Sequence, residues 1–553
     1  MPDPPRSGVI LDRAAFLADL LGDGGRLYVV SNRAPVTFAR DRAAPEGVAG
    51  RRASGGLVTA LAELGRHAPV TWIAAADTEE DALAASLLGL PSSRLRALPD
   101  GERRFVRRAM ELLNQAMPGQ DLRLRLVSLP DDVYERYYEV VSNPFLWFLQ
   151  HQMYALPFGP NVDADLIDAW RTAYRPANRA LALATVEAIG RQPRPIVLLQ
   201  DYHLYLAAPV IREARPDATI LHFTHVPWPP DSVWQVIPQG IRRAICEGLL
   251  ACDVIGLQTD RYASHFLDTV ASFVRDARVD PAGRAVRWRG RTIRVRTYPI
   301  SVDPDGLARF ARSADVEHRL DRLRERAARA GDPLLVVRAD RIEPSKNALR
   351  GFLAFEALLA ARPELRSRVR FVAVQAPTRT TIPEYAEYAA AVREVVARVN
   401  GLAEPDDQPI WIYDGTDYAM AIAALRAADV VVVNPVVDGM NLVVKEAILV
   451  GEREPAIILS ETAGAAEQLA ADCLTVAPAD IAGTVDQLQR ALEMPFDERH
   501  GRLRRLRASV RAEDVRWWLD RQLRDLAAVR RGLMPPSRRM RDAVRRVEPP
   551  VPE

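Results

Sequence analysis

A strand followed at once by a polar turn and a helix is the feature that most constrains the fold of this chain. Residues 429–437 form an apolar, β-branched run, typical of a strand buried in a parallel sheet. An Asp438-Gly439 turn follows, and the residues from Leu442 to Val450 are apolar at helical spacing and end at Gly451. Ligands bind at such turns, because they lie at the carboxyl ends of the strands. Glu446, one turn into the helix, can accept two vicinal hydroxyls, as a ribose presents; the alternative is a helix-capping Asp438 and a solvated Glu446.

The length and charge of the chain exclude several classes of protein. At 553 residues it is too long for one hydrophobic core and suits two domains of roughly 200 to 300 residues each. The 74 basic and 72 acidic side chains leave a net charge of +2, which gives no reason to expect nucleic acid or a membrane as a partner. Three cysteines without metal-ligand spacing, no apolar run of transmembrane length and no signal-peptide pattern together predict a cytoplasmic protein.

Arginine supplies almost all of the positive charge. Lys346 and Lys445 are the only lysines in the sequence. A lysine kept where arginine is otherwise used indicates a task that a broad guanidinium performs less well, such as acting as a compact point charge. Lys445 directly precedes Glu446, so at least one of the two lies inside the strand–turn–helix motif.

The first half of the chain contains an arrangement that suits a phosphate. An expected strand from Arg26 to Ser31 is followed by Asn32-Arg33, and a polar loop then leads to Gly55-Gly56 at the start of a helix. Glycine lets backbone N–H groups approach an anion at a helix start. The fingerprint Gly-x-Gly-x-x-Gly does not follow the strand, which argues against a hydride-transferring dehydrogenase.

Three later strands also end in polar residues. Asp201 follows the expected strand 195–200, and His225 follows the expected strand 219–224. Arg341 and Lys346 lie five positions apart after the expected strand 334–338. A fixed Arg and Lys at such a turn can stabilise an anionic leaving group, whose negative charge grows as its bond breaks, without a metal. The alternative for these two cations is a solvated salt-bridge turn.

The order of these blocks resembles the trehalose-6-phosphate synthase family, retaining glycosyltransferases of family 20 with the GT-B fold. The resemblance runs from about Leu27 to about Val529. It rests on Ser-Asn-Arg33, the Gly-Gly pair, Tyr137-Tyr138 with Asn143 and Trp147, Asp201-Tyr-His, His225-Val-Pro-Trp-Pro, Arg341-x-x-x-x-Lys346 and Asp438-Gly-Met-Asn-Leu-Val-Val-Lys-Glu446.

The resemblance implies an α/β architecture of two facing Rossmann-like domains with parallel sheets and an interdomain cleft. It also implies that glucose passes from a nucleotide diphosphate-glucose, with UDP-glucose favoured, to glucose 6-phosphate, giving α,α-trehalose 6-phosphate with retention. The resemblance further implies attack on the front face, with the leaving diphosphate accepting the proton of the acceptor hydroxyl.

The family's functional residues carry over position by position. The implied catalytic residues are Asp201, His225, Arg341, Lys346 and Asp438. The implied donor-binding residues are Gly55, Gly56, His225, Arg341, Lys346, Asp438, Gly439, Met440, Asn441, Leu442 and Glu446. The implied acceptor-binding residues are Arg33, Trp72, Tyr138, Trp147, Asp201 and Arg379. Neither a metal nor a cofactor is expected: Asp163-Ala-Asp165 matches a metal motif of another glycosyltransferase fold, but it precedes a helical pattern and is predicted to cap it.

The chain departs from the family pattern beside the expected acceptor site. After Trp72 the family usually continues with a glycine and a second tryptophan, whereas residues 74–77 read Ala-Ala-Ala-Asp. Residues 77–130 form a longer insertion than expected, and Val437 stands where many relatives have arginine. A sister transferase that uses glycerol 3-phosphate or a cyclitol phosphate therefore stays open. A catalytically silent, sugar-nucleotide-binding subunit is a further alternative, disfavoured by the intact cations and carboxylates. The donor base and a homo-oligomeric state are also open.

Four segments are expected. Residues 1–305 form the acceptor-side domain and residues 306–505 the nucleotide-sugar domain. Residues 506–534 form a helix that crosses back to the first domain, and the composition of residues 535–553 predicts a disordered tail.

Overall fold

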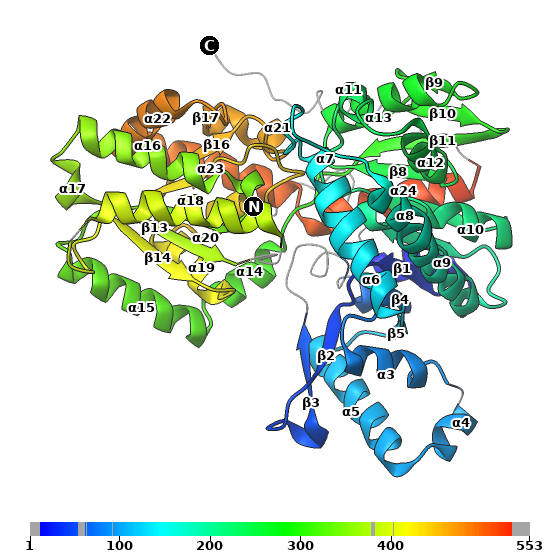
Figure 1. The fold of residues 1–553 in the computed structure, drawn as a ribbon. Coiled ribbons are helices and arrows are strands. Elements are labelled where there is room, and N and C mark those ends of the chain that lie inside the picture. Colours follow the sequence, from blue (N-terminus) through cyan, green and yellow to red (C-terminus); the bar gives the residue numbers. More distant parts are fainter. Residues whose placement is uncertain are drawn as a thin grey trace. The chain divides into compact units, whose positions relative to one another are not determined.

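The computed structural model describes residues 12–52, 61, 64–90, 92–377, 382–401 and 403–532, and it divides into two compact units (Figure 1). The N-terminal unit comprises the described parts of residues 7–150, 154–298 and 519–553, and the C-terminal unit those of 151–153 and 299–518. The chain leaves the N-terminal unit between Tyr298 and Pro299 and returns to it between Trp518 and Leu519. The expected tail, residues 535–553, lies outside the described residues.

Within the described residues, the N-terminal unit contains a nine-stranded sheet. Its strands are parallel from the first edge as far as β11, and β10 and β9 complete the sheet as an antiparallel meander. In spatial order they are β5 (Leu122–Val127), β4 (Val70–Ala75), β1 (Leu27–Ser31), β6 (Ile196–Gln200), β7 (Thr219–Phe223), β8 (Val254–Leu257), β11 (Arg291–Thr297), β10 (Ala285–Trp288) and β9 (Arg278–Asp280).

Strands β1, β4, β6 and β7 are buried along their whole length, as expected for apolar runs in a sheet that is covered on both faces. Their carboxyl ends lie at one edge of the sheet. Arg33, Asp77, Asp201 and His225, which follow these ends, are therefore brought to the same edge.

Helices and one hairpin surround this sheet. The helices are α1 (Arg13–Leu21), α3 (Glu79–Leu87), α4 (Ser92–Ala97), α5 (Asp100–Ala116), α6 (Asp131–Glu135), α7 (Phe148–Gln150), α8 (Ala164–Ala169), α9 (Arg175–Ile189), α10 (Ala207–Ala214), α11 (Asp231–Trp234), α12 (Gln239–Leu249) and α13 (Asp260–Phe273). The expected insertion 77–130 folds as α3, α4, α5 and β5, and α3 and α5 pack on the hairpin of β2 (Val36–Arg40) and β3 (Val48–Arg52) (Figure 1).

The helical pattern after Asp163 is interrupted by a π-helical segment, Trp170–Tyr174, between α8 and α9. Asp163 is the N-cap of α8, and its carboxylate accepts a hydrogen bond from the backbone N–H of Leu166 at 2.9 Å. The prediction that Asp163-Ala-Asp165 caps a helix is confirmed.

The C-terminal unit contains a fully parallel sheet, six-stranded within the described residues. In spatial order its strands are β14 (Ile410–Asp414), β13 (Val369–Ala376), β12 (Leu334–Arg341), β15 (Val430–Val433), β16 (Ala456–Ser460) and β17 (Leu474–Val476). Its helices are α14 (Pro304–Ala311), α15 (Ala314–Arg329), α16 (Ala348–Ala361), α17 (Leu365–Arg368), α18 (Pro383–Asn400), α19 (Tyr418–Ala427), α20 (Leu442–Val450), α21 (Ala466–Leu469), α22 (Ile481–Glu493), α23 (Phe496–Ala512) and α24 (Val515–Arg530).

The core of the C-terminal unit lies between its sheet and the helices α16, α18 and α22, which pack together over one face. Phe352 and Phe355 of α16 meet Phe371 of β13 with ring centroids 5.1 and 5.2 Å apart. α15, α19 and α20 form a second group of packed helices. This doubly covered parallel sheet gives the fold expected from the apolar strand runs.

Three strand limits differ from those expected. The strand expected at 429–437 ends at Val433, because Asn434 is followed by Pro435, which has no N–H for the sheet. The strand expected to end at Arg338 continues to Arg341, paired with β13 throughout. Residues 249–259 also match a strand pattern in sequence, but β8 begins only at Val254, since α12 includes Leu249.

The last helix, α24, belongs to both units, and its later residues are tied to the N-terminal unit. Arg13 donates to the two carboxylate oxygens of Asp520 at 2.7 and 2.9 Å, and Tyr298 donates to Asp525 at 2.6 Å. None of the helices in the described part of the chain is long and apolar enough to cross a membrane.

Candidate active site

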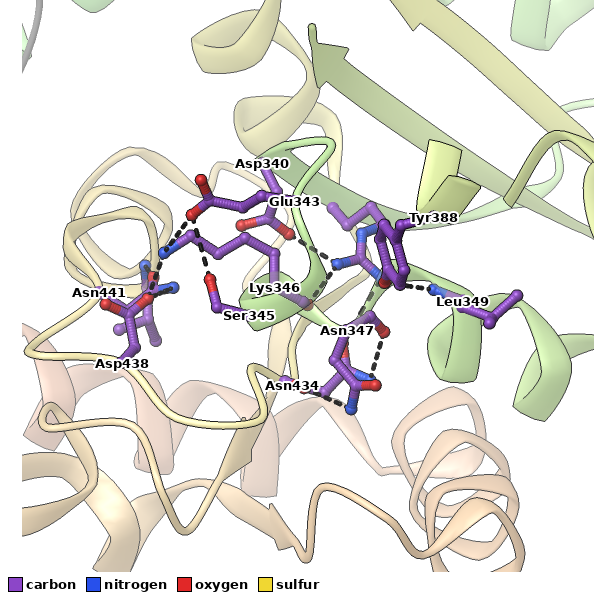
Figure 2. A network of polar contacts seen from close by, with 12 residues as sticks. Asp340, Glu343, Ser345, Lys346, Asn347, Leu349, Tyr388, Asn434, Asp438 and Asn441 are labelled. Carbon is purple, nitrogen blue, oxygen red and sulfur yellow. Dashed lines mark hydrogen bonds and ion pairs between the residues drawn. The ribbon is translucent and has the colours of Figure 1, made fainter. Parts of the chain in front are cut away.

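A buried carboxylate organises the turn between β12 and α16. Glu343 is 1% exposed, and its Oε1 accepts hydrogen bonds from Arg341 Nη2 and from Ser345 Oγ, both at 3.1 Å. The Lys346 ammonium lies 3.8 Å from the same oxygen. Figure 2 shows Glu343 above Ser345 and Lys346 in this turn. The two cations expected to stabilise a leaving group are thus brought together by an acid between them.

Lys346 also contacts the Asp-Gly-Met-Asn loop. Its Nζ donates to Asp438 Oδ2 at 2.5 Å, and Asn441 Nδ2 donates to the same oxygen at 3.1 Å (Figure 2). Burial alone would lower the pKa of Lys346, but the carboxylates of Asp438 and Glu343 raise it above its ordinary value. Burial would raise the pKa of Asp438, and the Lys346 ammonium holds it below its ordinary value. Both groups are therefore ionised at neutral pH.

The loop that carries Asp438 is fixed by the turn that follows β16. The Thr462 hydroxyl donates to the backbone oxygen of Val436 at 2.6 Å, and the backbone N–H of Gly464 donates to the Asp438 backbone oxygen at 3.1 Å. A Cβ on Gly464 would lie 1.9 Å from the backbone oxygen of Gly439, so only glycine fits there. The backbone N–H of Ala465 donates to the Met440 oxygen at 2.9 Å, which fixes the loop as far as α20.

Helix α20 begins at Leu442 and has Asn441 as its N-cap. Asn441 has a positive φ of 73°, and its side-chain oxygen accepts from the backbone N–H of Val444 at 3.3 Å. Glu446, one turn later, accepts a hydrogen bond from the Tyr418 hydroxyl at 2.7 Å. Burial raises the pKa of Glu446 to about 7. A carboxylate with this environment titrates close to physiological pH.

The two lysines lie in different environments. Lys445 is 0% exposed, and its Nζ donates to the backbone oxygen of Ile300 at 3.0 Å. Burial lowers the pKa of Lys445 to about 8. Lys346 takes part in the charge cluster described above, whereas Lys445 anchors α20 to the segment that follows Tyr298.

In the N-terminal unit, Asp201 and His225 meet at the ends of the neighbouring strands β6 and β7. Asp201 has a positive φ of 71°, and its Oδ1 accepts from the backbone N–H groups of His225 at 3.0 Å and Val226 at 3.4 Å. The His225 ring nitrogen Nε2 lies 3.0 Å from Gln200 Oε1. Burial raises the pKa of Asp201 to about 6 and lowers the pKa of His225 to about 3. His225 is therefore neutral at physiological pH and can act only through hydrogen bonds.

Arg33 and Tyr138 meet beside this pair. Arg33 Nη2 donates to the Tyr138 hydroxyl at 2.8 Å. The Tyr138 ring stacks on Tyr134 and on His203, with centroids 5.8 and 5.9 Å apart. Since His203 lies two residues after Asp201, the expected acceptor residues Arg33, Tyr138 and Asp201 form one neighbourhood within the N-terminal unit.

Two of the expected acceptor residues are placed less suitably. Trp72 is 1% exposed inside β4, and its indole N–H donates to Ser31 Oγ at 2.7 Å. Trp147 is 3% exposed and packs edge-on against Phe148. Neither ring offers a face to a sugar in this structure, because both aromatic residues fill the core. Their contact with the acceptor stays a prediction.

Three expected site residues, Gly55, Gly56 and Arg379, lie outside the described residues. Among the residues that the structure does describe, no group of three or more His, Cys, Asp or Glu side chains is arranged to hold a metal ion.

The structure adds residues that the sequence analysis did not single out. Glu343 lies between two assigned cations, but an acid in a polar turn looks like a solvated charge in sequence. Tyr418 and Gly464 are far in sequence from the groups they contact, so only the fold brings them there. Asp77 is the last of the residues 74–77 that differ from the family pattern. Its Oδ1 accepts a hydrogen bond from the Tyr134 hydroxyl at 3.2 Å, beside Tyr138.

The model of glycosyltransferase family 20 matches residues 25–528. The chain belongs to this family. It is therefore a retaining glycosyltransferase, and its two parallel-sheet units are those of the GT-B fold. The family and fold predicted from the order of the sequence blocks are confirmed.

Relatives within family 20 differ in what their names say they act on. The chain is 32% identical over 505 residues to a validamine 7-phosphate valienyltransferase of Streptomyces hygroscopicus subsp. jinggangensis, covering 91% of this chain and 95% of that protein. It is 30% identical over 512 residues to a UDP-forming α,α-trehalose-phosphate synthase of Schizosaccharomyces pombe, covering 91% of each.

A solved structure of the same kind covers most of both chains. The α,α-trehalose-phosphate synthase (UDP-forming) of Burkholderia xenovorans, in complex with glucose-6-phosphate, matches with a TM-score of 0.73 and 28% identity, over 91% of this chain and 100% of that one.

Proposed function

We propose that this family 20 enzyme transfers glucose from a nucleoside diphosphate-glucose, with UDP-glucose as the favoured donor, to glucose 6-phosphate, and so forms α,α-trehalose 6-phosphate. The observation that carries the proposal is the joint placement of Arg341, Lys346 and Asp438 around Glu343 in the C-terminal unit. The two cations suit a diphosphate that gains charge as the bond to the sugar breaks. The Asp438 carboxylate suits sugar hydroxyls, and Glu446 suits the ribose hydroxyls.

The N-terminal unit supports the acceptor half of the proposal. Arg33 is exposed and can form charge-assisted hydrogen bonds with a phosphate, and the Tyr138 hydroxyl beside it can hydrogen-bond to a hexose. Asp201, which accepts a hydrogen bond from the backbone N–H of the neutral His225, is the residue that we propose orients an acceptor hydroxyl. We assign no general base, because the leaving diphosphate itself is expected to take the acceptor's proton.

The experiment that tests this function is a substrate panel. UDP-, GDP- and ADP-glucose are each offered with glucose 6-phosphate, glycerol 3-phosphate and cyclitol phosphates, and release of the nucleoside diphosphate and the identity of the product are measured. Lys346→Ala in the same panel controls for contaminating activity. Turnover with glucose 6-phosphate, and with none of the other acceptors, supports the proposal. If no pair of donor and acceptor releases a nucleoside diphosphate, the proposal is wrong.

A second acceptor class has one observation in its favour. Residues 74–77, which differ from the family pattern, end in Asp77. Its exposed carboxylate contacts Tyr134 and lies near Arg33 and Tyr138. A carboxylate beside the arginine that is proposed to bind phosphate favours an acceptor substrate with a hydrogen-bond-donating group or an amine, such as an aminocyclitol phosphate. The relative named as a validamine 7-phosphate valienyltransferase fits this candidate. The same panel, extended by an aminocyclitol phosphate, separates the two.

A further inference from the structure

Arg338 lies in β12, three residues before Arg341, and has no exposed surface (0%). A buried charge is costly unless it is paired and hydrogen-bonded. Arg338 Nη2 donates to Asp340 Oδ2 at 2.8 Å and to the backbone oxygen of Lys346 at 3.0 Å. Its Nη1 donates to Asn434 Oδ1 at 3.5 Å. One guanidinium therefore joins strand β12, the turn that carries Lys346 and the loop that leads to the sugar-binding motif.

The same turn and loop are joined a second time. Asn347 has a left-handed backbone (φ 59°, ψ 33°), which asparagine tolerates better than most residues. Its Nδ2 donates to the backbone oxygens of Asn434 at 2.9 Å and Pro478 at 2.7 Å, and Asn434 Nδ2 donates back to the Asn347 oxygen at 3.4 Å. Figure 2 shows Asn347 and Asn434 side by side below Lys346. The turn and the loop thus have one fixed separation.

Helix α16 leaves room for the guanidinium at Gly351. A Cβ at this position would lie 2.6 Å from Arg338 Nη1 and 3.6 Å from the Asn434 side chain. Glycine in a helix interior is destabilising relative to alanine. The space that Gly351 leaves for Arg338 is the physical reason that the structure offers for a glycine here.

We propose that Arg338 is a positioning residue for the transfer reaction. It holds the backbone of Lys346 and the loop of Asp438 at one separation, so that the ammonium meets the diphosphate while the carboxylate meets the sugar of the same donor molecule. The inference rests on the proposed function, which gives Lys346 and Asp438 these roles. A lysine cannot replace Arg338, because one ammonium has no rigid fork of donors aimed at several acceptors.

A double-mutant cycle tests this inference. Arg338→Lys should lower kcat by about 100-fold, with a smaller change in the donor KM, because a misplaced stabilising charge is felt most in the transition state. In a Lys346→Ala background the same change should cost clearly less than 100-fold, because the ammonium that Arg338 positions is gone and only the loop of Asp438 can still be displaced. A merely structural role would give the same factor in both backgrounds. Gly351→Ala, which crowds the guanidinium, should also lower kcat more in the wild type than in Lys346→Ala, but by a smaller factor. It replaces Arg338→Lys in the cycle if that variant does not fold.

The matched control is Arg370→Lys. Arg370 is also buried (2% exposed) and lies in the neighbouring strand β13, but its Nη1 donates to the backbone oxygens of Arg366 and Val369. This variant should keep a kcat near that of the wild type. If Arg338→Lys lowers kcat by the same factor in the wild type and in Lys346→Ala, the inference is wrong. The proposed function then still stands, because the wild-type enzyme turns over. A wild-type protein that transfers glucose to no acceptor overturns both.

Discussion

Lys346 is the residue whose chemistry is most sharply defined by its surroundings. Its ammonium lies between the Asp438 and Glu343 carboxylates, on a stem that is mostly buried. A guanidinium is broader and planar, and it would crowd the neighbouring Arg341. The scarcity of lysine in the sequence pointed to this position, and also to Lys445, which proved to lie in the interior and to bind a backbone oxygen.

We expect Lys346→Ala to lower kcat by about two to three decades, the usual cost of removing one preorganised stabiliser of a developing charge. Lys346→Arg should recover only part of this loss, and donor binding should change less than turnover in both variants. Steady-state kinetics measure the effect. Lys445→Arg is the control: it overfills a buried site and should lower the melting temperature rather than kcat. A near-normal kcat in Lys346→Arg contradicts the argument.

Two carboxylates give separate pH dependences. The pKa of Glu446 is raised to about 7 and that of Asp201 to about 6, both by burial. Each is proposed to act as an anion, so each function is present above its pKa and is lost as the pH falls through it. Donor affinity should therefore weaken below about pH 7, and kcat/KM for the acceptor should fall further below about pH 6. Glu446→Gln should remove the first dependence and Asp201→Asn the second; unchanged profiles would refute the assignments.

At the scale of elements, the loop from Asn434 to Asn441 is held by contacts that lie outside the motif itself. The turn after β16 holds this loop: the backbone N–H of Gly464 donates to the Asp438 oxygen, and a Cβ on Gly464 would lie 1.9 Å from the Gly439 oxygen. Contacts from a neighbouring strand connection thus fix the loop, and the sequence of the motif alone does not show this.

Gly464→Ala should displace this loop and weaken donor binding, because its Cβ would lie 1.9 Å from a backbone oxygen that cannot give way. Gly501→Ala is the matched control, since Gly501 lies inside α23 and a Cβ there would come no closer than 3.6 Å to Arg505. That change should stabilise the protein by up to about 1 kcal/mol. Donor titrations and thermal unfolding of both variants measure these effects, and equal donor affinity in Gly464→Ala would contradict the loop's role.

The elements were predictable from sequence where burial alone decides them. The apolar runs at β1 and β6 fold as strands, because short β-branched apolar runs of this kind are typical of strands in a parallel sheet that is covered on both faces. Strand ends were less predictable. Arg338 resembles a strand terminus in sequence, yet β12 continues past it, because Asp340 and two loop oxygens neutralise the buried guanidinium.

The candidate site was predictable where motif residues meet one another, and less so where tertiary packing decides. Arg341, Lys346 and Asp438 come together as the resemblance implied. Trp72 and Trp147 are buried, and an aromatic ring that can bind a sugar can equally fill a core, so their contact with the acceptor stays a prediction. Gly55, Gly56 and Arg379 lie beyond the described residues, so their roles rest on the resemblance.

At the scale of the whole molecule, each unit depends on residues that are distant in sequence. Helix α1, the first described helix of the N-terminal unit, is bound to α24, the last one. Arg13 of α1 forms a bidentate ion pair with the fully buried Asp520 of α24. The unit is therefore closed by residues from both ends of the described chain.

Asp520→Asn should lower the free energy of unfolding of the N-terminal unit by about 3–5 kcal/mol, because it leaves a largely buried guanidinium without its counter-charge. Asp19→Asn, which breaks the exposed contact with Arg531, should have little effect. Urea unfolding followed by intrinsic fluorescence measures both variants. Equal stability of Asp520→Asn and the wild type would mean that α24 contributes little to this unit.

The contact between Lys346 and Asp438 should affect how tightly the nucleoside diphosphate is bound once the sugar has been transferred. Under the proposed function, the sugar occupies Asp438 and frees the ammonium for the diphosphate, so the two halves of one donor molecule help each other to bind. The spent nucleoside diphosphate has no sugar and must compete with Asp438 for Lys346. Asp438→Asn should therefore raise affinity for UDP by about tenfold, roughly 1.4 kcal/mol, without raising affinity for UDP-glucose; calorimetric titration of both ligands measures this, and a parallel fall in both affinities contradicts it. Under the proposed function, a lysine that returns to its carboxylate after each turnover hastens release of the nucleoside diphosphate and limits product inhibition.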